Sequence, residues 1–377
     1  MRSWIHLDKS ALVHNFQLFR EVAGSAQVIA VLKSNAYGHG IKEVWQALEE
    51  QNPRWIGVNY LYEAAQLRDL GCRSRLLVMG PIAPDSLEEA ASLNVDLVLS
   101  APELMDAWIL SPHKPAAHIK FDTGMSRLGF SPEDAGAIAQ RLLPHHGLVA
   151  GILSHFANVE DVTEHNYAQQ QLERFEAAKR AFADAGLRDL LAHIASSASA
   201  LLLESSRYHL VRIGISLYGQ WPSQATRLSF LQRHSRLLDL KPALEWRTEI
   251  ANLRPVKAGA FVGYGCTFRA NHDMLVAILP VGYFEGYPRL ASTGAAYVLV
   301  NGQRCPIVGR ICMNMMMVEV THVSNLKSGN PVTLIGTDGD EYLSAGQLAE
   351  WSQTINYEIL SRINPNITRI LKPSSNS

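Results

Sequence analysis

Charged side chains are scarce in this chain, and neither sign predominates. Only 18% of the 377 residues are Asp, Glu, Lys or Arg, against about 25% in ordinary globular domains. The 34 basic side chains nearly cancel the 35 acidic ones, and no segment is rich in Lys or Arg. This balance gives no long-range attraction for phosphate backbones or acidic membrane surfaces. It therefore argues against nucleic acid and against a membrane surface as main partners.

Cysteine and long apolar runs are also scarce. The four cysteines are scattered, with no C-x-x-C pair and no spacing typical of a metal site. No segment approaches the ~18 apolar residues that a membrane span needs, and the N-terminus lacks the apolar core of a secretion signal. We therefore expect a cytoplasmic protein in a reducing compartment, without a metal.

Short apolar runs, in contrast, are plentiful between Gln27 and Tyr218, and a helical pattern usually follows each one. Continuous apolar runs indicate strands that are buried on both faces, as in a parallel sheet. Eight such runs in about 190 residues favour a (β/α)₈ barrel of the TIM type over a doubly wound sheet. The runs are Val28–Leu32, Trp55–Val58, Leu76–Met79, Val95–Leu99, His118–Phe121, Val149–Leu153, Leu191–Ile194 and Val211–Ile213.

The pattern changes after about Pro242. Short β-type runs separated by turn residues follow, among them Glu249–Val256, and Asn301-Gly302 is a strong hairpin signal between two others. The length also fits two domains. We therefore expect an α/β chain with a barrel domain at 1–240 and a mainly β C-terminal domain at 241–377.

Lys33 is the first candidate for chemistry, because it closes an apolar strand before the Gly-rich segment 38–40. A lysine in this position is usually an end residue with its amine in water. In a barrel, however, the strand C-termini carry the active site. A desolvated lysine there can react with an aldehyde cofactor and act as a base.

Further candidates follow the later strands of the predicted barrel. After the fifth strand, Lys120, Asp122 and Arg127 are equally compatible with a structural ion-pair cluster and with a carboxylate clamp formed by Arg127. The loops after the seventh and eighth strands frequently bind phosphate in barrel enzymes. His155 follows the sixth strand and Ser197 the seventh, and the eighth strand with its loop contributes Arg212, Gly214 and Ile215.

In the β part, three Gly-bracketed segments contain Tyr264, Tyr283 and Met313. Each alone is most often a tight turn, and Gly263-Tyr264-Gly265 lacks the strand–helix context of a dinucleotide site.

Together, six segments resemble the motifs of the alanine racemase family, in the family's order and over nearly the whole chain. They are Ala30–Gly40, Lys120–Gly129, Arg212–Gly219, Gly263–Gly265, Gly309–Met313 and Asn356–Glu358. The resemblance implies a pyridoxal-phosphate-dependent isomerase that interconverts L- and D-alanine through a cofactor aldimine. It also implies a homodimer with shared active sites that supplies D-alanine for peptidoglycan.

The resemblance implies a role for each matching residue. Lys33 would hold the cofactor and act as one catalytic base, and Tyr264 from the other subunit would be the second base. Arg127, Met313 and Tyr283 would bind the substrate, and Lys120 resembles a lysine that many members carry carbamylated. Arg212 would face the pyridine nitrogen. The remaining cofactor-binding residues would be Tyr37, His155, Ser197, Gly214, Ile215 and Tyr357.

Three departures from the family pattern are present; the first concerns cofactor contacts, and the other two leave substrate breadth open. Ser196 stands where Asn is usual, Asn314 where Asp is usual, and Phe284-Glu285 where Ala-Asp is usual. A racemase that accepts more amino acids, or prefers serine, is therefore an alternative. Tyr357 would crowd a larger side chain and favours alanine.

Two further alternatives fit the residues less well. A barrel-type decarboxylase would usually place glutamate where this chain has Arg212. A non-catalytic pyridoxal-phosphate carrier would have no use for Tyr264 and Met313.

Overall fold

The computed structural model describes residues 2–159, 165–292 and 294–372. Contacts between Cα atoms divide the chain into two compact units. The first, here called the barrel unit, comprises Ala11–Ser34 and Val44–Pro242. The second, here called the β unit, comprises Met1–Ser10, Asn35–Glu43 and Ala243–Ser377. The domain limits at residues 240 and 241 stay a prediction.

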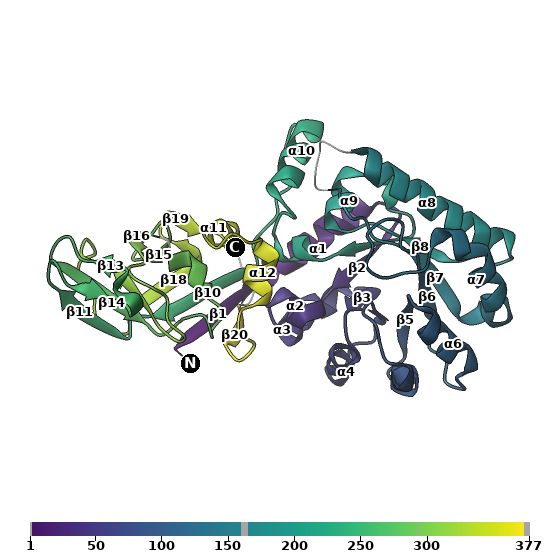
Figure 1. The fold of residues 1–377 in the computed structure, drawn as a ribbon, viewed down its shortest axis with the longest axis horizontal. Coiled ribbons are helices and arrows are strands. Elements are labelled where there is room, and N and C mark those ends of the chain that lie inside the picture. The colour runs from purple at the N-terminus through teal and green to yellow at the C-terminus, as the bar shows by residue number, and fades with distance from the viewer. Residues whose placement is uncertain (1, 160–164, 293, 373–377) are drawn as a thin grey trace. The chain divides into compact units, whose positions relative to one another are not determined.

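The barrel unit contains the eight parallel strands that the apolar runs predicted, which confirms the fold class (Figure 1). Their order in the sheet is β8-β7-β6-β5-β4-β3-β2-β9. The strands are β2 (Gln27–Val31), β3 (Trp55–Val58), β4 (Arg75–Val78), β5 (Val95–Leu99), β6 (Ala117–Lys120), β7 (Val149–Leu153), β8 (Leu191–His193) and β9 (Leu210–Ile213).

Backbone hydrogen bonds join the two end strands of this sheet, although β8 and β9 form no regular ladder. The N–H of His209 donates to the carbonyl of Ala192 over 3.1 Å, and the N–H of Arg212 donates to the carbonyl of Ala195 over 3.0 Å. The sheet is therefore nearly closed into a barrel. Because all eight strands are parallel, their carboxyl ends face one side of this barrel.

Helices follow the strands and pack around the sheet (Figure 1). The 20 residues of α8 form the longest of them. The helices are α1 (Lys9–Ala23), α2 (Lys33–Tyr37), α3 (Ile41–Leu48), α4 (Leu61–Asp69), α5 (Leu87–Ser92), α6 (Pro102–Leu110), α7 (Ala135–Leu142), α8 (His165–Asp184), α9 (Ser197–Leu202) and α10 (Gln224–His234).

The β unit is built on a sheet with the order β16-β15-β18-β10-β1-β20, and β19 pairs with β18. The N-terminal strand β1 lies in its interior, antiparallel to β10 and parallel to β20. The strands are β1 (Ser3–Asp8), β10 (Leu244–Glu249), β15 (Tyr297–Val300), β16 (Gln303–Pro306), β18 (Pro331–Asp338), β19 (Glu341–Leu343) and β20 (Thr368–Lys372).

Two smaller sheets complete the strands of the β unit. They are β11-β14-β17 and β12-β13. Their strands are β11 (Asn252–Val256), β12 (Phe261–Val262), β13 (Phe268–Arg269), β14 (Met274–Leu279) and β17 (Met316–Glu319), and the unit also contains α11 (Ala345–Trp351) and α12 (Asn356–Ser361).

One predicted strand of the β unit was wrong, and the predicted hairpin is confirmed. The run Glu249–Val256 is not one strand, because the chain leaves the large sheet after Glu249 and enters another sheet at Asn252. Asn301 and Gly302 both have positive φ, and they connect β15 to β16 at the pair Val300 and Gln303. Positive φ at both positions is the conformation of a type I′ turn.

Candidate active site

Lys33 lies at the carboxyl end of β2, where the sequence placed it. Burial lowers the pKa of its amine, and the positive charges of Arg127 and Arg212 lower it further. Glu63 opposes this shift. A lysine with a lowered pKa has a larger neutral fraction at neutral pH, and the neutral amine is the form that reacts with a carbonyl group.

The backbone after Lys33 makes a left-handed turn. Ser34, Asn35, Ala36 and Tyr37 all have φ between 53° and 55°. This conformation costs about 1–2 kcal/mol per residue for L-amino acids, so it persists only where other contacts hold it.

Glu63 on α4 provides part of that support, and the sequence analysis missed it. The side chain is 1% exposed. Its carboxylate accepts hydrogen bonds from the backbone N–H of Ser34 over 2.6 Å and of Asn59 over 2.8 Å. Glu63 thus ties the residue after Lys33 to the end of β3. The only signal in the sequence is an acidic residue in the first turn of a helix.

Four further cationic or titratable side chains surround Lys33 within the barrel unit. Burial and the charges of Arg127 and Arg212 lower the pKa of Lys120, at the end of β6, to about 8. Burial and then Arg212 lower the pKa of His155 well below its ordinary value, with contributions from Arg127, Lys120 and Lys33. The structure therefore brings these five predicted residues, from strands β2, β6, β7 and β9 and the loops that follow them, within electrostatic reach of one another.

The segment 122–127 is shaped by the carboxylate of Asp122. It accepts hydrogen bonds from the backbone N–H groups of Gly124, Met125 and Arg127, over 2.9, 2.7 and 2.8 Å. Asp122 therefore bonds the backbone of this loop and fixes the position from which the Arg127 side chain extends.

Arg212, on β9, is fully anchored at its two terminal nitrogens. Nη1 donates to Nδ1 and to the carbonyl oxygen of His193, and Nη2 donates to the carbonyls of Ser154 and Ile194 and to Nδ1 of His155. Among the described residues, none accepts a hydrogen bond from Nε. That N–H is the one donor of the guanidinium left for a ligand.

The loops after β8 and β9 also meet. Ser197 Oγ accepts a hydrogen bond from the backbone N–H of Gly214 over 3.1 Å. Ser197, Gly214 and the following Ile215 are all buried. The departure at Ser196 is accommodated locally, since its backbone N–H donates to Ser199 Oγ over 2.7 Å.

The other predicted site residues belong to the β unit. The rings of Tyr37 and Tyr357 lie 6.2 Å apart at an angle of 52°. Burial raises the pKa of Tyr37, so its hydroxyl stays protonated and can donate a hydrogen bond. These two tyrosines were predicted to bind the cofactor, and the structure places them side by side.

Tyr264, Met313 and Tyr283 extend from three neighbouring loops of the β unit. A β-carbon on Gly263 would lie 3.3 Å from the backbone nitrogen of Arg310, and one on Gly282 would lie 2.2 Å from the carbonyl oxygen of Cys312. The approach at Gly282 requires glycine, and the one at Gly263 is tighter than most β-carbon contacts, so glycine at both positions lets these backbones pass closely. The side chains are exposed by 72% for Tyr264, 54% for Met313 and 44% for Tyr283.

Two departures from the family pattern contact each other in the β unit. Asn314 Nδ2 donates to Glu285 Oε1 over 2.9 Å. The other carboxylate oxygen of Glu285 accepts from the backbone N–H of Gly282 over 2.8 Å. Asn314 and Glu285 therefore form a matched pair that joins the loops of Tyr283 and Met313.

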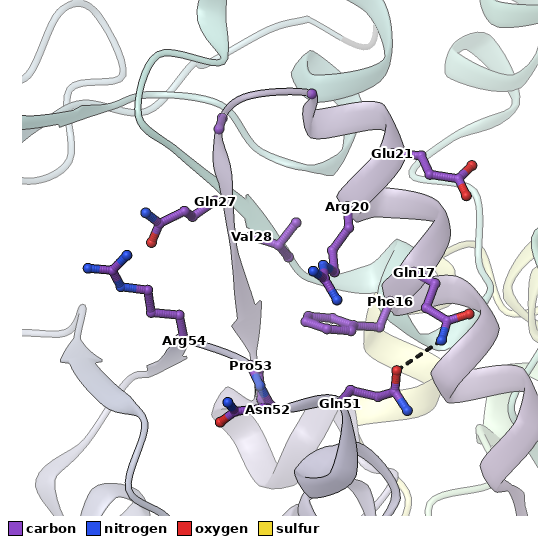
Figure 2. A pocket seen from close by; sticks show the side chains of 12 residues that line it. Phe16, Gln17, Arg20, Glu21, Gln27, Val28, Gln51, Asn52, Pro53 and Arg54 are labelled. Atoms are coloured by element: carbon purple, nitrogen blue, oxygen red, sulfur yellow. Dashed lines mark hydrogen bonds between the residues drawn. The ribbon is translucent and has the colours of Figure 1, made fainter.

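A groove of about 670 Å³ opens elsewhere on the barrel unit (Figure 2). It is lined by α1, by the start of β2 at Gln27 and by the segment 51–54 before β3. Across it, Gln17 donates a hydrogen bond to Gln51 over 2.9 Å. The groove lies at the amino ends of the strands, opposite the end that carries Lys33.

In the described part of the chain, no helix combines the length and the apolar character that crossing a membrane requires.

Comparison with known proteins identifies relatives over the whole chain. Residues 7–222 match a family model described as alanine racemase, N-terminal domain, and residues 243–371 match one described as alanine racemase, C-terminal domain. An alanine racemase of Leptospira interrogans is 41% identical over 98% of this chain and 95% of its own length. One from Geobacter sulfurreducens is 37% identical over 98% and 97%.

Solved structures agree with these relatives. The crystal structure of alanine racemase from Bacillus anthracis with bound L-Ala-P superposes with a TM-score of 0.90 at 32% identity, covering 100% of this chain and 96% of that one. The biosynthetic alanine racemase from Pseudomonas aeruginosa gives 0.85 at 32% identity, covering 99% and 100%.

Proposed function

This chain belongs to the alanine racemase family, and on that premise we propose how its residues interconvert L- and D-alanine with pyridoxal 5′-phosphate. The observation that supports the proposal best is the arrangement around Lys33. A lysine amine with a lowered pKa lies among Arg127, Arg212, Lys120 and His155, at the catalytic end of a barrel.

The residues of the barrel unit fit the chemistry of the cofactor. Pyridoxal phosphate, when bound, supplies a ring that withdraws electrons and stabilises negative charge at Cα of an amino acid. Lys33 supplies the amine that reacts with its aldehyde. Arg212 directs its open Nε–H donor to the pyridine nitrogen, and a guanidinium hardly ever gives up its proton. The ring nitrogen then stays unprotonated, which restrains transamination.

The phosphate is bound by neutral donors in this proposal. The Ser197 hydroxyl and the backbone amides of Gly214 and Ile215 supply them from the loops after β8 and β9, and Tyr37 and Tyr357 supply phenol groups. His155 contacts the cofactor from the end of β7. Backbone and hydroxyl donors can bind a phosphate without adding charge, in a site that already contains several cations.

The substrate carboxylate is bound by Arg127 and by the backbone amide of Met313, with Tyr283 beside them. Arg127 presents the planar fork that pairs with a carboxylate. The neutral amine of Lys120 adds to CO₂ and releases one proton to water, which gives a carbamate, an anion that positions the guanidinium of Arg127. The pKa of Lys120, about 8, supports this proposal because only the neutral amine attacks CO₂.

Two bases act on opposite faces of the substrate Cα. Lys33 Nζ moves the proton on one face, and the Tyr264 hydroxyl moves it on the other. Tyr264 is largely exposed on its own chain and reaches the site of a second copy in a head-to-tail homodimer. The exposed apolar side chains beside it, Phe284 and Met313, support an interface there. The dimer works in the cytoplasm and supplies D-alanine for peptidoglycan.

The decisive experiment is incubation of the pure holoenzyme with L-alanine in D₂O. Loss of the Cα–H NMR signal together with D-alanine on chiral chromatography is expected. Release of CO₂ would indicate a decarboxylase, and unchanged alanine would indicate a carrier. Borohydride reduction and peptide mapping should label Lys33. Lys33→Ala should abolish both results, whereas Lys42→Ala, at an exposed lysine on α3, should change neither.

A further inference from the structure

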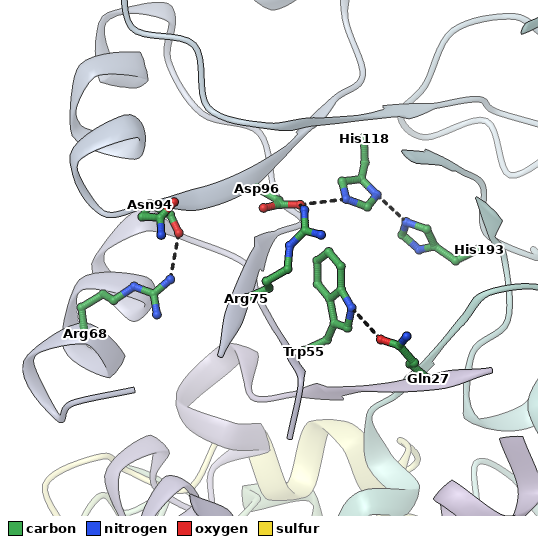
Figure 3. Close-up of polar contacts among 8 residues, drawn as sticks. All are labelled: Gln27, Trp55, Arg68, Arg75, Asn94, Asp96, His118 and His193. Carbon is green, nitrogen blue, oxygen red and sulfur yellow. Dashed lines mark hydrogen bonds and ion pairs between the residues drawn. The ribbon is translucent and has the colours of Figure 1, made fainter. Parts of the chain in front are cut away.

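A line of buried polar side chains crosses the barrel unit from His193 through His118 to Asp96 (Figure 3), and Arg212 contacts it at His193. Arg212 Nη1 lies 2.7 Å from Nδ1 of His193. Nε2 of His193 lies 2.9 Å from Nδ1 of His118, and Nε2 of His118 lies 3.1 Å from Oδ2 of Asp96. The same carboxylate oxygen accepts from Arg75 over 2.6 Å. The line connects four strands, from β9 through β8 and β6 to β5.

The direction of every hydrogen bond in this line follows from its two ends. Arginine only donates, so Nδ1 of His193 must accept and its proton must lie on Nε2. That Nε2–H then donates to Nδ1 of His118, whose own proton must lie on Nε2. His118 therefore donates to Asp96, and a carboxylate is the acceptor needed there. One arrangement of protons satisfies the whole line, and both imidazoles are neutral in it.

Burial agrees with two neutral rings. His118 and His193 are fully buried, and Asp96 is 6% exposed. Burial lowers the pKa of both histidines, and the charge of Arg212 lowers that of His193 further. A proton added to Nδ1 of His193 would face the cation of Arg212.

The fold makes room for the central hydrogen bond. Strand β7 runs between β6 and β8, and its residue beside the two rings is Gly151. A β-carbon on Gly151 would lie 2.3 Å from Nδ1 of His118, the atom that accepts from His193. The rings of Trp55 and His118 pack in a T-shaped arrangement, with centroids 5.7 Å apart.

We propose that Asp96, His118 and His193 are positioning residues for Arg212. Their line of hydrogen bonds keeps both imidazoles neutral with the proton on Nε2, so that Nδ1 of His193 carries no proton and accepts from the guanidinium. This inference rests on the proposed contact of Arg212 with the cofactor nitrogen. None of the three touches the substrate. They hold the guanidinium so that its Nε–H keeps one direction.

The first test needs no variant. Long-range ¹H–¹⁵N correlation spectra of ¹⁵N-histidine-labelled holoenzyme distinguish the two neutral forms of imidazole and the cation. We expect His118 and His193 to be neutral with the proton on Nε2 from pH 6 to pH 9. Signals that disappear in His118→Phe and in His193→Asn assign the two rings. A proton on Nδ1 of either ring, or a cation, would overturn the inference.

The second test compares two changes in the same part of the barrel. His118→Phe removes the hydrogen bonds of His118 to His193 and to Asp96 and keeps an aromatic ring. Trp55→Phe instead disturbs the packing against the His118 ring and leaves these two hydrogen bonds in place. We expect kcat for alanine to fall about tenfold or more in His118→Phe, with KM nearly unchanged because Arg127 binds the substrate. The His193 ¹⁵N shift and the ratio of transamination to racemisation should change with it.

Trp55→Phe should lower thermal stability and move neither the ¹⁵N shift nor that ratio. His118→Gln can both accept and donate, and it should recover part of kcat. If both Phe variants reduce kcat equally with unchanged product ratios, the residues are merely structural and the inference fails. A wild-type enzyme that does not racemise alanine would instead refute the proposed function, and the proton positions would still be measurable.

Discussion

The proposed sharing of active sites between two subunits makes a quantitative prediction for mixed dimers. Lys33 belongs to the barrel unit, and Tyr264 belongs to the β unit with 72% of its side chain exposed. Lys33→Ala and Tyr264→Phe should each inactivate a homodimer. In a hybrid, one site combines an intact Lys33 with the intact Tyr264 of its partner, and the other site carries both defects.

The magnitude follows from random exchange of subunits. A site works when its barrel comes from the Tyr264→Phe subunit and its tyrosine comes from the Lys33→Ala subunit. The working share is the product of the two mole fractions. The activity of the mixture should therefore be about a quarter of wild-type activity when the two variants are mixed in equal amounts, and about a fifth when they are mixed at a ratio of one to three. Coupled detection of D-alanine across a series of ratios should trace this parabola.

A matched control mixture tests whether the recovered activity comes from active sites shared between subunits or from unspecific reactivation of the variants. Arg127 lies in the same unit as Lys33, so mixing Lys33→Ala with Arg127→Ala should restore nothing at any ratio. If mixing Lys33→Ala with Tyr264→Phe also gives no activity, after mass spectrometry has verified exchange, then Tyr264 acts within its own chain or not at all.

Three further predictions concern single positions. With the pKa of Lys120 at about 8, ¹³C NMR at fixed dissolved CO₂ should show its carbamylation rate rising with pH and levelling off near pH 8; a rise that continues to pH 10 would contradict the shift. Asn314→Asp places a second carboxylate 2.9 Å from buried Glu285, so it should cost about 1–2 kcal/mol at pH 8. Because one carboxyl of the pair then titrates at a raised pKa, the loss in thermal midpoint should shrink at pH 5. Gly219→Ala should destabilise by more than about 1 kcal/mol, because its φ is +78° and a β-carbon would lie 1.9 Å from a backbone carbonyl; Gly136→Ala, on open helix surface, should not lower the midpoint.

Short-range sequence patterns predicted the strands of the barrel well, because parallel strands buried on both faces must be apolar throughout. The left-handed turn at 34–37 was beyond such patterns. None of its residues is glycine, and part of its support comes from Glu63, far along the chain. The backbone preferences of L-residues disfavour this left-handed turn, so it cannot be predicted without the tertiary contacts that stabilise it.

The candidate site divides in the same way. Lys33 was singled out because it closes an apolar strand at the end of a barrel where active sites lie, and Tyr264 because of the family resemblance and its two flanking glycines; their roles stay proposals. His118 and His193 were read only as members of strands. The only signal in the sequence was that each histidine lies inside an apolar run. Their roles depend on the hydrogen bond between them and on the space that Gly151 leaves for it, and neither can be predicted from one segment alone.

The position of β1 has a consequence for folding during synthesis. This strand is synthesised before the barrel sequence, yet its two neighbours, β10 and β20, begin only at Leu244 and Thr368. The whole barrel sequence is translated while β1 has neither partner, so the contact order of the β unit is high and its assembly is slow. An unpaired strand is also open to chaperones and to strands of other nascent chains. Deleting the first eight residues should therefore trap the β unit late in assembly, after the barrel strands are complete.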